Sequence, residues 1–459
     1  MTNARYAPVL LTGLLLAFAA PAASAKDYEV GPGKALDSIG AVPWETLEAG
    51  DTVLIYWRPE SYKEKFVICR AGTAEKPITV RGVPGPDGQL PLLDGRGATH
   101  RAEIDYWNAD RCVVKIGGAR KPADMMPAYI VIENLDISGA RPPYTSFVNG
   151  KETVYVESAS AIYVEKCDNV VVRNCTLHDS SNGFFIASST NDALLEGCYI
   201  YGNGLDGSIY VHNNYTSARG MTFQFNHFAA LRTGCPGNNL KDRSAGTVVR
   251  YNWIEAGNRQ LDLVEEGGMV DDPRYRETFV YGNVLIEHEG EGNPQMVHYG
   301  GDNDRADRYR KGTLYFYNNT CVSDRATRTT LLRLSTNDET CDMRNNIVFT
   351  TAAGDTFDLV DETGTLKMSH NWLKEGYKTI REEGAAGKVE DDGSNIVGAD
   401  PAFVDLAGQD FHLAEKSPCL GAATELAPAA KAFRLEFEYV KHQKGKKRDP
   451  APKPNIGAY

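Results

Sequence analysis

Apolar and polar residues alternate with a period of two in short segments along the middle of the chain. Such alternation predicts β-strands, because a helix would repeat its apolar positions every 3.6 residues. Nine of these segments can be matched to one another: residues 132–137, 171–177, 195–200, 223–228, 249–254, 280–285, 316–321, 343–348 and 368–373. One position of the match is held mostly by amides: Leu135, Cys175, Cys198, Asn226, Asn252, Asn283, Asn319, Asn346 and Asn371.

The spacing of this repeat predicts a solenoid. Successive matched positions lie between 23 residues (Cys175 to Cys198) and 40 residues (Leu135 to Cys175) apart. A period of this size in alternating strands is typical of a parallel β-helix, whereas the leucine-rich consensus is missing. Stacked Asn amides can hydrogen-bond along such a stack at the ~4.8 Å strand spacing. We therefore expect an all-β, single-stranded parallel β-helix over residues 26–425.

The two ends of the solenoid have their own signals. Residues 43–48 predict a short N-terminal helical cap, because a solenoid must cover its open apolar end. Residues 400–404 and 417–421 are interpreted as terminal rungs. Residues 426–459 are expected to form an Ala-rich helix, a basic, proline-rich and solvated tail, and a terminal strand.

Residues 1–25 have the pattern of a secretory signal peptide, with Arg5, an apolar stretch and an Ala-Ser-Ala cleavage site ending at Ala25. The apolar stretch is shorter than the ~20 residues of a membrane span. We therefore expect a secreted protein, periplasmic or extracellular, with no membrane span.

The composition narrows the range of partners. The formal net charge of -12 argues against a general nucleic-acid-binding surface. We expect a monomer that binds a saccharide. The nine cysteines are too few for a disulfide scaffold. Cys175 and Cys198 share the repeat column, and we favour buried free thiols there over a disulfide.

A second strand precedes the amide strand in six rungs, at residues 183–188, 208–213, 239–244, 260–265, 295–300 and 331–334. Because side chains alternate between the two faces of a strand, the match predicts two outward columns. One contains Phe185, Tyr210, Lys241 and Asp262, and the other contains Ala187, His212, Arg243 and Val264. In the fifth strand either His298 or the pair Val297 and Tyr299 faces outward.

These columns suit an acidic polysaccharide. Cleavage of a uronate chain by β-elimination needs a cation on the carboxylate, a base for the C5 proton and an acid for the leaving oxygen. Arg243 can bind the carboxylate. Lys241 beside it should have a lowered pKa and serve as base, and Tyr210 or His212 would be the acid.

The remaining site predictions lie on neighbouring rungs and loops. Asp262 completes the predicted catalytic set, and His298, Tyr299 and Arg333 are expected to bind substrate. The alternative is that these residues have no catalytic role and form only a solvent-exposed face with a Lys241–Asp262 ion pair. Insertions at residues 267–277 and 300–311 are expected to build one wall of the groove.

Three sets of residues carry a family resemblance: residues 50–53, 72–73 and 77–80, the Asn rungs, and residues 455–459. In these residues the chain resembles the secreted right-handed parallel β-helix proteins of the pectate-lyase-like superfamily. The resemblance covers nearly the whole mature chain and implies a right-handed solenoid. It does not imply one chemistry, because that superfamily includes lyases, hydrolases, epimerases and adhesins.

Residues 239–254 resemble the alginate lyase and chondroitinase B group, which implies that Lys241 is the catalytic lysine. That group has an Arg-His pair on the next rung, where this chain has Leu261, Asp262 and Leu263. The resemblance therefore does not identify a general acid in this chain. Residues 260–265 resemble the calcium rung of another pectate lyase group. Asp262, Glu265 and Glu266 are therefore calcium candidates, with Asp302 and Asp304 as a second set.

Two other classes of function stay open. A β-helix glycoside hydrolase needs two carboxylates flanking one bond, for which Asp262 could pair with Glu265 or with Asp242, although Asp242 is expected to point inward. A non-catalytic carbohydrate-binding surface protein would yield no product. An unsaturated sugar end, visible by its ultraviolet absorbance, would identify a lyase.

Overall fold

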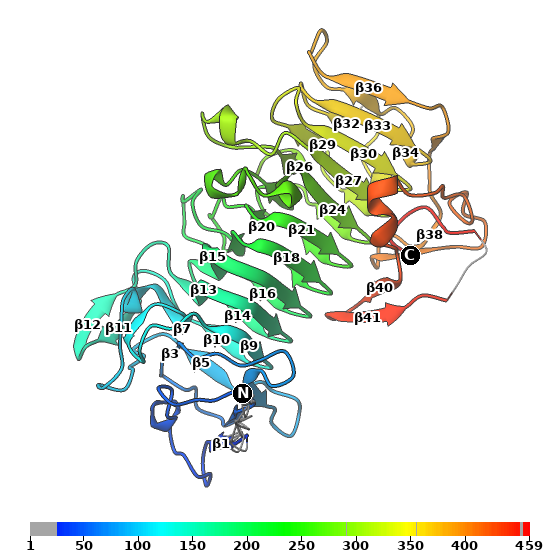
Figure 1. Ribbon diagram of the computed structural model, residues 1–459. Coiled ribbons are helices and arrows are strands. Elements are labelled where there is room, and N and C mark those ends of the chain that lie inside the picture. The colour runs from blue at the N-terminus through cyan, green and yellow to red at the C-terminus, as the bar shows by residue number, and fades with distance from the viewer. Residues whose placement is uncertain (1–24, 291, 355, 450–452) are drawn as a thin grey trace, which may run out of the picture.

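Each repeat of the alternating pattern folds into one rung of three short parallel strands. The computed structural model describes residues 25–449 and 453–459, apart from 291 and 355. The rungs stack into an elongated solenoid with three parallel sheets (Figure 1). The predicted signal peptide lies outside the described residues except for Ala25.

Within a rung the chain passes from sheet 1 to sheet 2 and then to sheet 3, and β13 and β15 run through the first two. Sheet 1 contains β3 (Phe66–Ile68), β7 (Cys112–Ile116), β13 (Ser160–Arg173), β15 (Asn182–Glu196), β17 (Asn214–Thr216), β20 (Leu240–Asp242), β23 (Leu261–Leu263), β26 (Gln295–Tyr299), β29 (Thr329–Leu334), β32 (Phe357–Val360) and β35 (Lys378–Ile380).

Sheet 2 continues each rung after a short turn or a longer loop. It contains β1 (Asp27–Val30), β2 (Thr52–Tyr56), β4 (Ile78–Val83), β9 (Ala128–Glu133), the second halves of β13 and β15, β18 (Arg219–Gln224), β21 (Ala245–Arg250), β24 (Glu277–Tyr281), β27 (Thr313–Tyr317), β30 (Thr340–Arg344), β33 (Thr365–Ser369) and β36 (Lys388–Asp391).

Sheet 3 closes each rung. It contains β5 (Leu92–Asp94), β10 (Asp136–Ser138), β14 (Thr176–His178), β16 (Tyr199–Tyr201), β19 (His227–Phe228), β22 (Trp253–Glu255), β25 (Val284–Glu287), β28 (Thr320–Ser323), β31 (Ile347–Thr350), β34 (Trp372–Lys374) and β37 (Ile396–Gly398).

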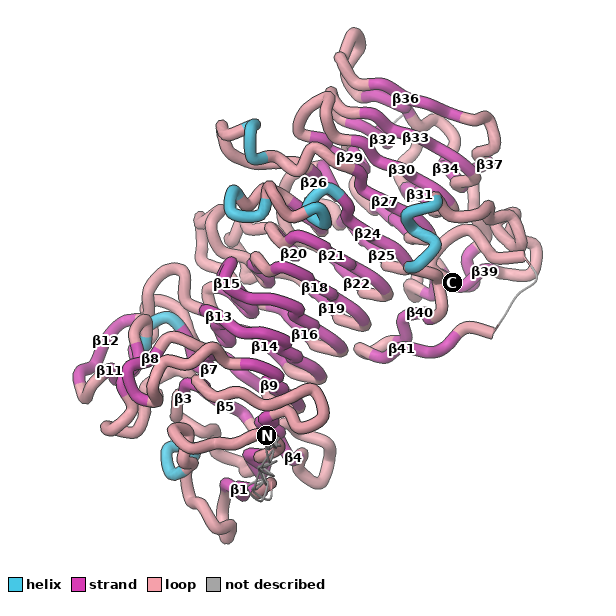
Figure 2. Tube along the Cα trace, in the orientation of Figure 1, coloured by secondary structure: helices cyan, strands magenta, loops and turns pink. Residues whose placement is uncertain are grey.

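Small hairpins and single helical turns decorate the solenoid (Figure 2). The antiparallel pairs are β6 (Asp105–Tyr106) with β8 (Ala119–Lys121), β11 (Thr145–Val148) with β12 (Lys151–Val154), β38 (Phe403–Asp405) with β39 (Asp410–Leu413), and β40 (Phe437–Val440) with β41 (Lys444–Lys447). The 3₁₀ helices are η1 (Ile39–Ala41), η2 (Ala109–Arg111), η3 (Gly267–Met269), η4 (Pro273–Arg276), η5 (Ala306–Arg308) and η6 (Pro428–Ala432).

The inside of the solenoid is a continuous apolar core. The inward side chains of all three sheets are mainly Val, Ile, Leu and Phe, and one cluster of buried side chains reaches from Val30 to Leu373. Strands that bury alternate side chains in this way are held in register, because a shift of one residue would expose the apolar set. This register also decides which side chains face outward.

The predicted amide column is confirmed. Each Asn donates from Nδ2 to Oδ1 of the next Asn at 2.9–3.1 Å, along Asn226, Asn252, Asn283, Asn319, Asn346, Asn371 and Asn395. The column therefore extends one rung beyond the sequence match. Cys175 and Cys198 are buried and free; the other seven cysteines are also free, and all of them except the partly exposed Cys235 are buried.

The ends differ in detail from the sequence expectation. Residues 43–48 form turns, and the helical turn of the N-terminal cap is η1; Trp44 covers the core by stacking on Phe66 at 4.2 Å. Residues 400–404 and 417–421 do not extend the sheets, because β38 pairs antiparallel with β39. The Ala-rich segment holds only η6 before β40 begins. Among the described residues no helix is long and apolar enough to cross a membrane.

Candidate active site

The outward column of sheet 1 changes from aromatic to ionic along the solenoid. Neighbouring strands place these side chains side by side in the order Tyr163, Phe185, Tyr215, Lys241, Asp262, His298 and Arg333. Their strand neighbours, such as Leu240, Leu261 and Val297, lie in the core. The predicted outward position is confirmed for Phe185, Lys241 and Asp262. Of the two alternatives for the fifth strand, His298 faces outward and the pair Val297 and Tyr299 faces inward.

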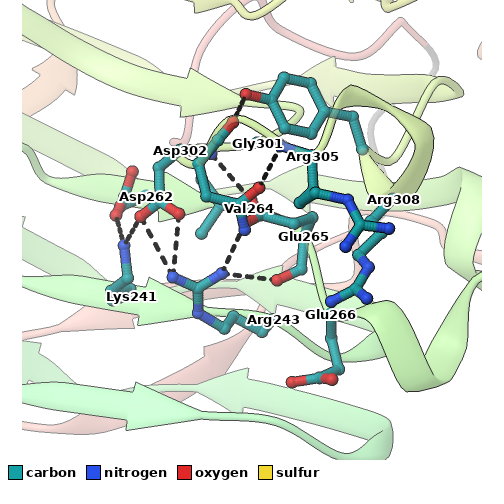
Figure 3. A network of polar contacts seen from close by, with 12 residues as sticks. Lys241, Arg243, Asp262, Val264, Glu265, Glu266, Gly301, Asp302, Arg305 and Arg308 are labelled. Atoms are coloured by element: carbon teal, nitrogen blue, oxygen red, sulfur yellow. Dashed lines mark hydrogen bonds and ion pairs between the residues drawn. The ribbon is translucent and has the colours of Figure 1, made fainter.

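Lys241 lies between two carboxylates. Its Nζ contacts Oδ2 of Asp262 on the next rung and Oδ2 of Asp302 on the loop after β26 (Figure 3). Burial alone would lower the pKa of Lys241, but Asp262 and Asp302 outweigh it and raise the pKa above its ordinary value. Arg243 also lowers this pKa, as expected, but the carboxylates outweigh it, so the expected net lowering is wrong and Lys241 is a buried ammonium.

Arg243 reaches over the same loop carboxylate. Its Nη2 donates to both oxygens of Asp302, at 2.9 and 3.2 Å, and its Nη1 lies 3.3 Å from Oε1 of Glu265. Two cations thus converge on Asp302, whose side chain is 29% exposed. Burial would raise the pKa of Asp302, but Lys241 and Arg243 hold it below its ordinary value.

Asp262 is a buried ionised carboxylate with full hydrogen bonding. It accepts from Asn238 Nδ2 at 2.7 Å, lies 2.8 Å from His298 Nδ1 and contacts Lys241. Burial would raise the pKa of Asp262, but Lys241 and His298 hold it well below its ordinary value. Burial lowers the pKa of His298 in spite of this partner. Asp262 therefore positions Lys241 and His298.

The tyrosine next to Lys241 is Tyr215 and not Tyr210. Residues 208–213 belong to a loop that contains Gly202, Gly204 and Gly207, all at positive φ, and the strand begins only at Asn214. Tyr210 is 78% exposed on that loop. Tyr215 is half-buried, and its hydroxyl accepts from Arg243 Nε at 3.0 Å.

His212 lies beside this tyrosine but is 2% exposed. Its ring meets the Tyr215 ring edge-on at 5.4 Å, and its Nδ1 accepts from the Asn238 backbone N–H at 2.9 Å. Burial and then the charge of Lys241 lower the pKa of His212 to about 3. A neutral, buried imidazole of this kind supports the site and does not suit the acid role that the sequence suggested.

The predicted substrate-binding residues separate. Tyr299 is fully buried in the core, because it pairs with Leu263 on the inward side of β26. His298 is only 3% exposed, and its Nε2 lies 2.9 Å from Ser335 Oγ. Arg333 is 47% exposed and continues the outward column. Arg333 therefore remains open to a ligand, whereas Tyr299 does not.

The two insertions contact each other, since the Tyr275 hydroxyl donates to the Arg308 carbonyl at 2.9 Å, and one buried arginine ties the second insertion to the solenoid. Arg310 is fully buried and donates to the carbonyls of Val264, Ser244 and Asp242 at 2.8–3.2 Å. The inward side chain of Asp242 lies 3.5 Å from its guanidinium. Arg310 ends the loop that carries Asp302, so it fixes the base of that loop.

The acidic rung does not fit calcium. The oxygens of Asp262 already serve Lys241, His298 and Asn238, and those of Glu265 serve Arg243, Asn303 and the Asp302 backbone N–H. Glu266 accepts from Gly268 at the start of η3, away from the other two (Figure 3). Asp302 is held by cations, and Asp304 is exposed. Among the described residues no three His, Cys, Asp or Glu side chains are grouped to hold a metal ion.

Comparisons with known proteins agree with the architecture. A family model described as "Right handed beta helix region" matches residues 128–293. The pectate lyase Pel9A is similar with a TM-score of 0.52 and 11% identity over 95% of this chain and 96% of that one. The GH136 lacto-N-biosidase from Eubacterium ramulus has a TM-score of 0.51 and 13% identity over 82% and 68% of the two chains. No curated protein matches the chain by sequence.

Proposed function

We propose that this right-handed parallel β-helix protein of pectate-lyase-like fold degrades a uronate-containing polysaccharide by β-elimination. The polysaccharide chain would lie along the outward column of sheet 1. Phe185 and Tyr215 lie half-buried on one side of Lys241, and the exposed Arg333 lies on the other. Sugar rings and carboxylates are the groups that such a surface binds.

One observation carries this proposal: Lys241 and Arg243 together already hold a carboxylate. That carboxylate belongs to Asp302, which comes from an exposed loop and not from the sheet. A uronate carries the same chemical group. When it replaces Asp302, the two cations neutralise its charge and so acidify the neighbouring C5–H bond.

Tyr215 is the proton carrier in this proposal. Its oxygen accepts from Arg243 Nε, so the carboxylate-binding cation and the proton-transfer group are in contact. As the phenolate it takes the C5 proton. The C–H electron pair forms the C4=C5 double bond, the C4–O bond breaks, and the same proton returns to the leaving oxygen. Lys241, as an ammonium, binds the carboxylate and is not the base.

A glycoside hydrolase is the second candidate, and one observation favours it. Burial raises the pKa of Glu265, whereas cations lower that of Asp302. Two carboxyl groups with pKa values pushed apart are typical of an acid and its partner base. However, the Glu265 side chain is 1% exposed beneath the loop, so it can meet a substrate only if the loop moves.

The first experiment is a product assay on a panel of uronate polysaccharides, with and without a chelator. We expect new ultraviolet absorbance from unsaturated sugar ends. The chelator should not reduce the activity, because the carboxylates of Asp262 and Glu265 are already paired with the side chains of Lys241 and Arg243. New reducing ends without this absorbance would favour the hydrolase. No product from any polysaccharide would favour a non-catalytic binding protein.

A second experiment uses Asp302→Ala. If Asp302 only fills the place of the substrate carboxylate, the variant still forms unsaturated ends and its KM for the polysaccharide falls. If Asp302 is the catalytic base of a hydrolase, the variant loses all turnover. Asp304→Ala, on the same loop, is the matched control and should behave like the unaltered protein.

Export and a monomeric state remain part of the proposal. The N-terminal sequence of the protein recovered from the periplasm or medium tests cleavage after Ala25. Its elution volume in size-exclusion chromatography tests the monomer.

A further inference from the structure

A second group of guanidinium side chains lies farther along the outward face of sheet 1. Arg333 follows His298 in the outward column, and Arg381, directly after β35, is two rungs beyond it. Arg259 lies on the turn before β23 and donates from Nη2 to Gln295 at 2.8 Å. None of these residues has a role in the proposed elimination step.

Two of the three arginines share one carboxylate, and Arg259 is linked to it through Gln295. Asp361 lies 3.9 Å from Arg333 and 3.5 Å from Arg381, and it accepts from the same Gln295 that Arg259 contacts. Arg381 also lies 3.4 Å from the exposed Glu382. These guanidinium groups gather in a protein whose formal net charge is -12. The ion pairs of Arg333 and Arg381 with Asp361 are long and both side chains are partly exposed, so both remain accessible to a further anion.

Arg259 has unused hydrogen-bonding capacity. Its Nε is buried and has no hydrogen-bond partner among the described residues. A buried guanidinium N–H without a partner is costly, and such groups in native proteins call for a ligand or water. Arg333 complements it, because its side chain is 47% exposed and its ion pair is long. Both observations point to a missing acceptor between them.

The distance from Lys241 assigns this acceptor to another sugar. Three steps between neighbouring strands separate Lys241 from Arg333, which is about 14 Å at the usual strand spacing. This is farther than one pyranose ring extends. A carboxylate at Arg333 therefore belongs to a different residue of a chain that runs along the solenoid axis.

We infer that Arg259, Arg333 and Arg381 form a second carboxylate-binding subsite. It binds another acidic sugar of the same polysaccharide, on the side of Lys241 that faces the C-terminal rungs. The inference rests on the proposed function for the identity of the ligand, but binding at this subsite does not require cleavage. It makes the protein selective for chains with more than one uronate.

The test measures binding and cleavage separately for Arg259→Gln with Arg333→Gln. Binding is followed by retardation in gels that contain alginate, polygalacturonate, hyaluronan or chondroitin, at several salt concentrations. We expect the double variant to bind roughly 10-fold more weakly to whichever polymer retards the unaltered protein. The salt dependence of its binding should also be shallower. Its KM for short oligomers that reach only Lys241 should not change.

Lys367→Gln is the control, because Lys367 lies on sheet 2 and its side chain is 50% exposed. It removes one positive charge away from the proposed subsite, as Arg333→Gln alone does within it, and should bind normally. Arg333→Lys keeps the charge without the forked donor and should recover part of the binding. Thermal unfolding of each variant checks that it is folded.

The outcomes separate the two proposals. Equal binding of the double variant and the unaltered protein, or an equal loss in Lys367→Gln, would overturn the second subsite while leaving the elimination reaction in place. Length-dependent loss of binding without any unsaturated product would support the subsite and overturn the lyase. An unaltered protein that binds none of the four polymers would overturn both.

Discussion

At the scale of single residues, the surroundings of a side chain decide its role more than its type does. Lys241 has the position expected of a base, but two carboxylates keep it protonated. His212 has the ring expected of an acid, but burial keeps it neutral. In the proposed reaction, proton transfer falls to Tyr215, whose hydroxyl accepts from Arg243.

The two tyrosines give a sharp test of this assignment. Tyr215→Phe should lower kcat by roughly 10²–10⁴, because the proton carrier is removed, and should change KM little. Tyr210→Phe, on the exposed loop, should leave both constants unchanged. Steady-state kinetics on the polysaccharide that the protein degrades measure both. The reverse ranking of the two variants would return the acid role to Tyr210.

His212 predicts a pH dependence of stability. Its pKa of about 3 in the folded protein lies below the ordinary 6.5, so between these values the unfolded chain binds a proton that the folded protein excludes. The stability is therefore complete above pH 6.5 and decreases by about 1.4 kcal/mol per pH unit as the pH falls toward 3.

Urea unfolding at pH 6.5 and pH 5 can isolate this contribution. His212→Gln keeps a hydrogen-bond acceptor and should lose roughly 2 kcal/mol less between the two pH values than the unaltered protein. His412→Gln, at a half-exposed side chain, is the control and should follow the unaltered protein. Identical pH dependence in all three proteins would contradict the assignment.

At the scale of elements, the amide column joins the rungs across the turn between sheets 2 and 3. Asn283 is a central member: its Oδ1 accepts from both the backbone N–H and Nδ2 of Asn252, at 2.9 and 3.0 Å. Because Asn283 and Asn252 are fully buried, water cannot replace these bonds.

Asn283→Ala should therefore cost roughly 2–5 kcal/mol of the free energy of unfolding, since it leaves two buried donors without an acceptor. The same substitution at Asn395, the partly exposed last member of the column, should cost less because water can reach the freed donors of Asn371. Chemical denaturation of both variants measures the difference. Equal costs at the two positions would mean that the column adds no stability in the interior.

At the scale of the whole molecule, the C-terminal segment folds back along the middle of the solenoid (Figure 1). Ile456 and Ala458 are buried there, and the backbone N–H of Gly457 donates to the Asn345 carbonyl at 2.8 Å. The solenoid is therefore covered along one side by residues that are distant in sequence. The sequence pattern predicts a helix, a solvated tail and a terminal strand for residues 426–459, but residues 455–459 form no strand and the basic segment contributes β41.

Gly457→Ala tests this packing. Gly457 has φ +97°, and an added Cβ would lie 2.7 Å from Ile347 Cδ1. We expect a loss of about 1–3 kcal/mol in stability, measured by thermal unfolding. Gly354→Ala shares the positive φ on a turn with no atom near the new Cβ, so it reports the backbone strain alone. A matching loss in both variants would show that the segment is not tightly packed.

The sequence by itself determined the rungs, the amide column and the outward positions of Lys241, Asp262 and Arg243, because these follow from a local period of two and from burial of the apolar residues. Tertiary structure decided which tyrosine stands beside Lys241, since the length of the loop before β17 leaves no trace in the alternation. It also decided the charge of Lys241. Asp302 reaches the lysine from the loop after β26, two rungs beyond β20, and Arg310 anchors that loop; electrostatic interactions depend on distance in space and not along the chain.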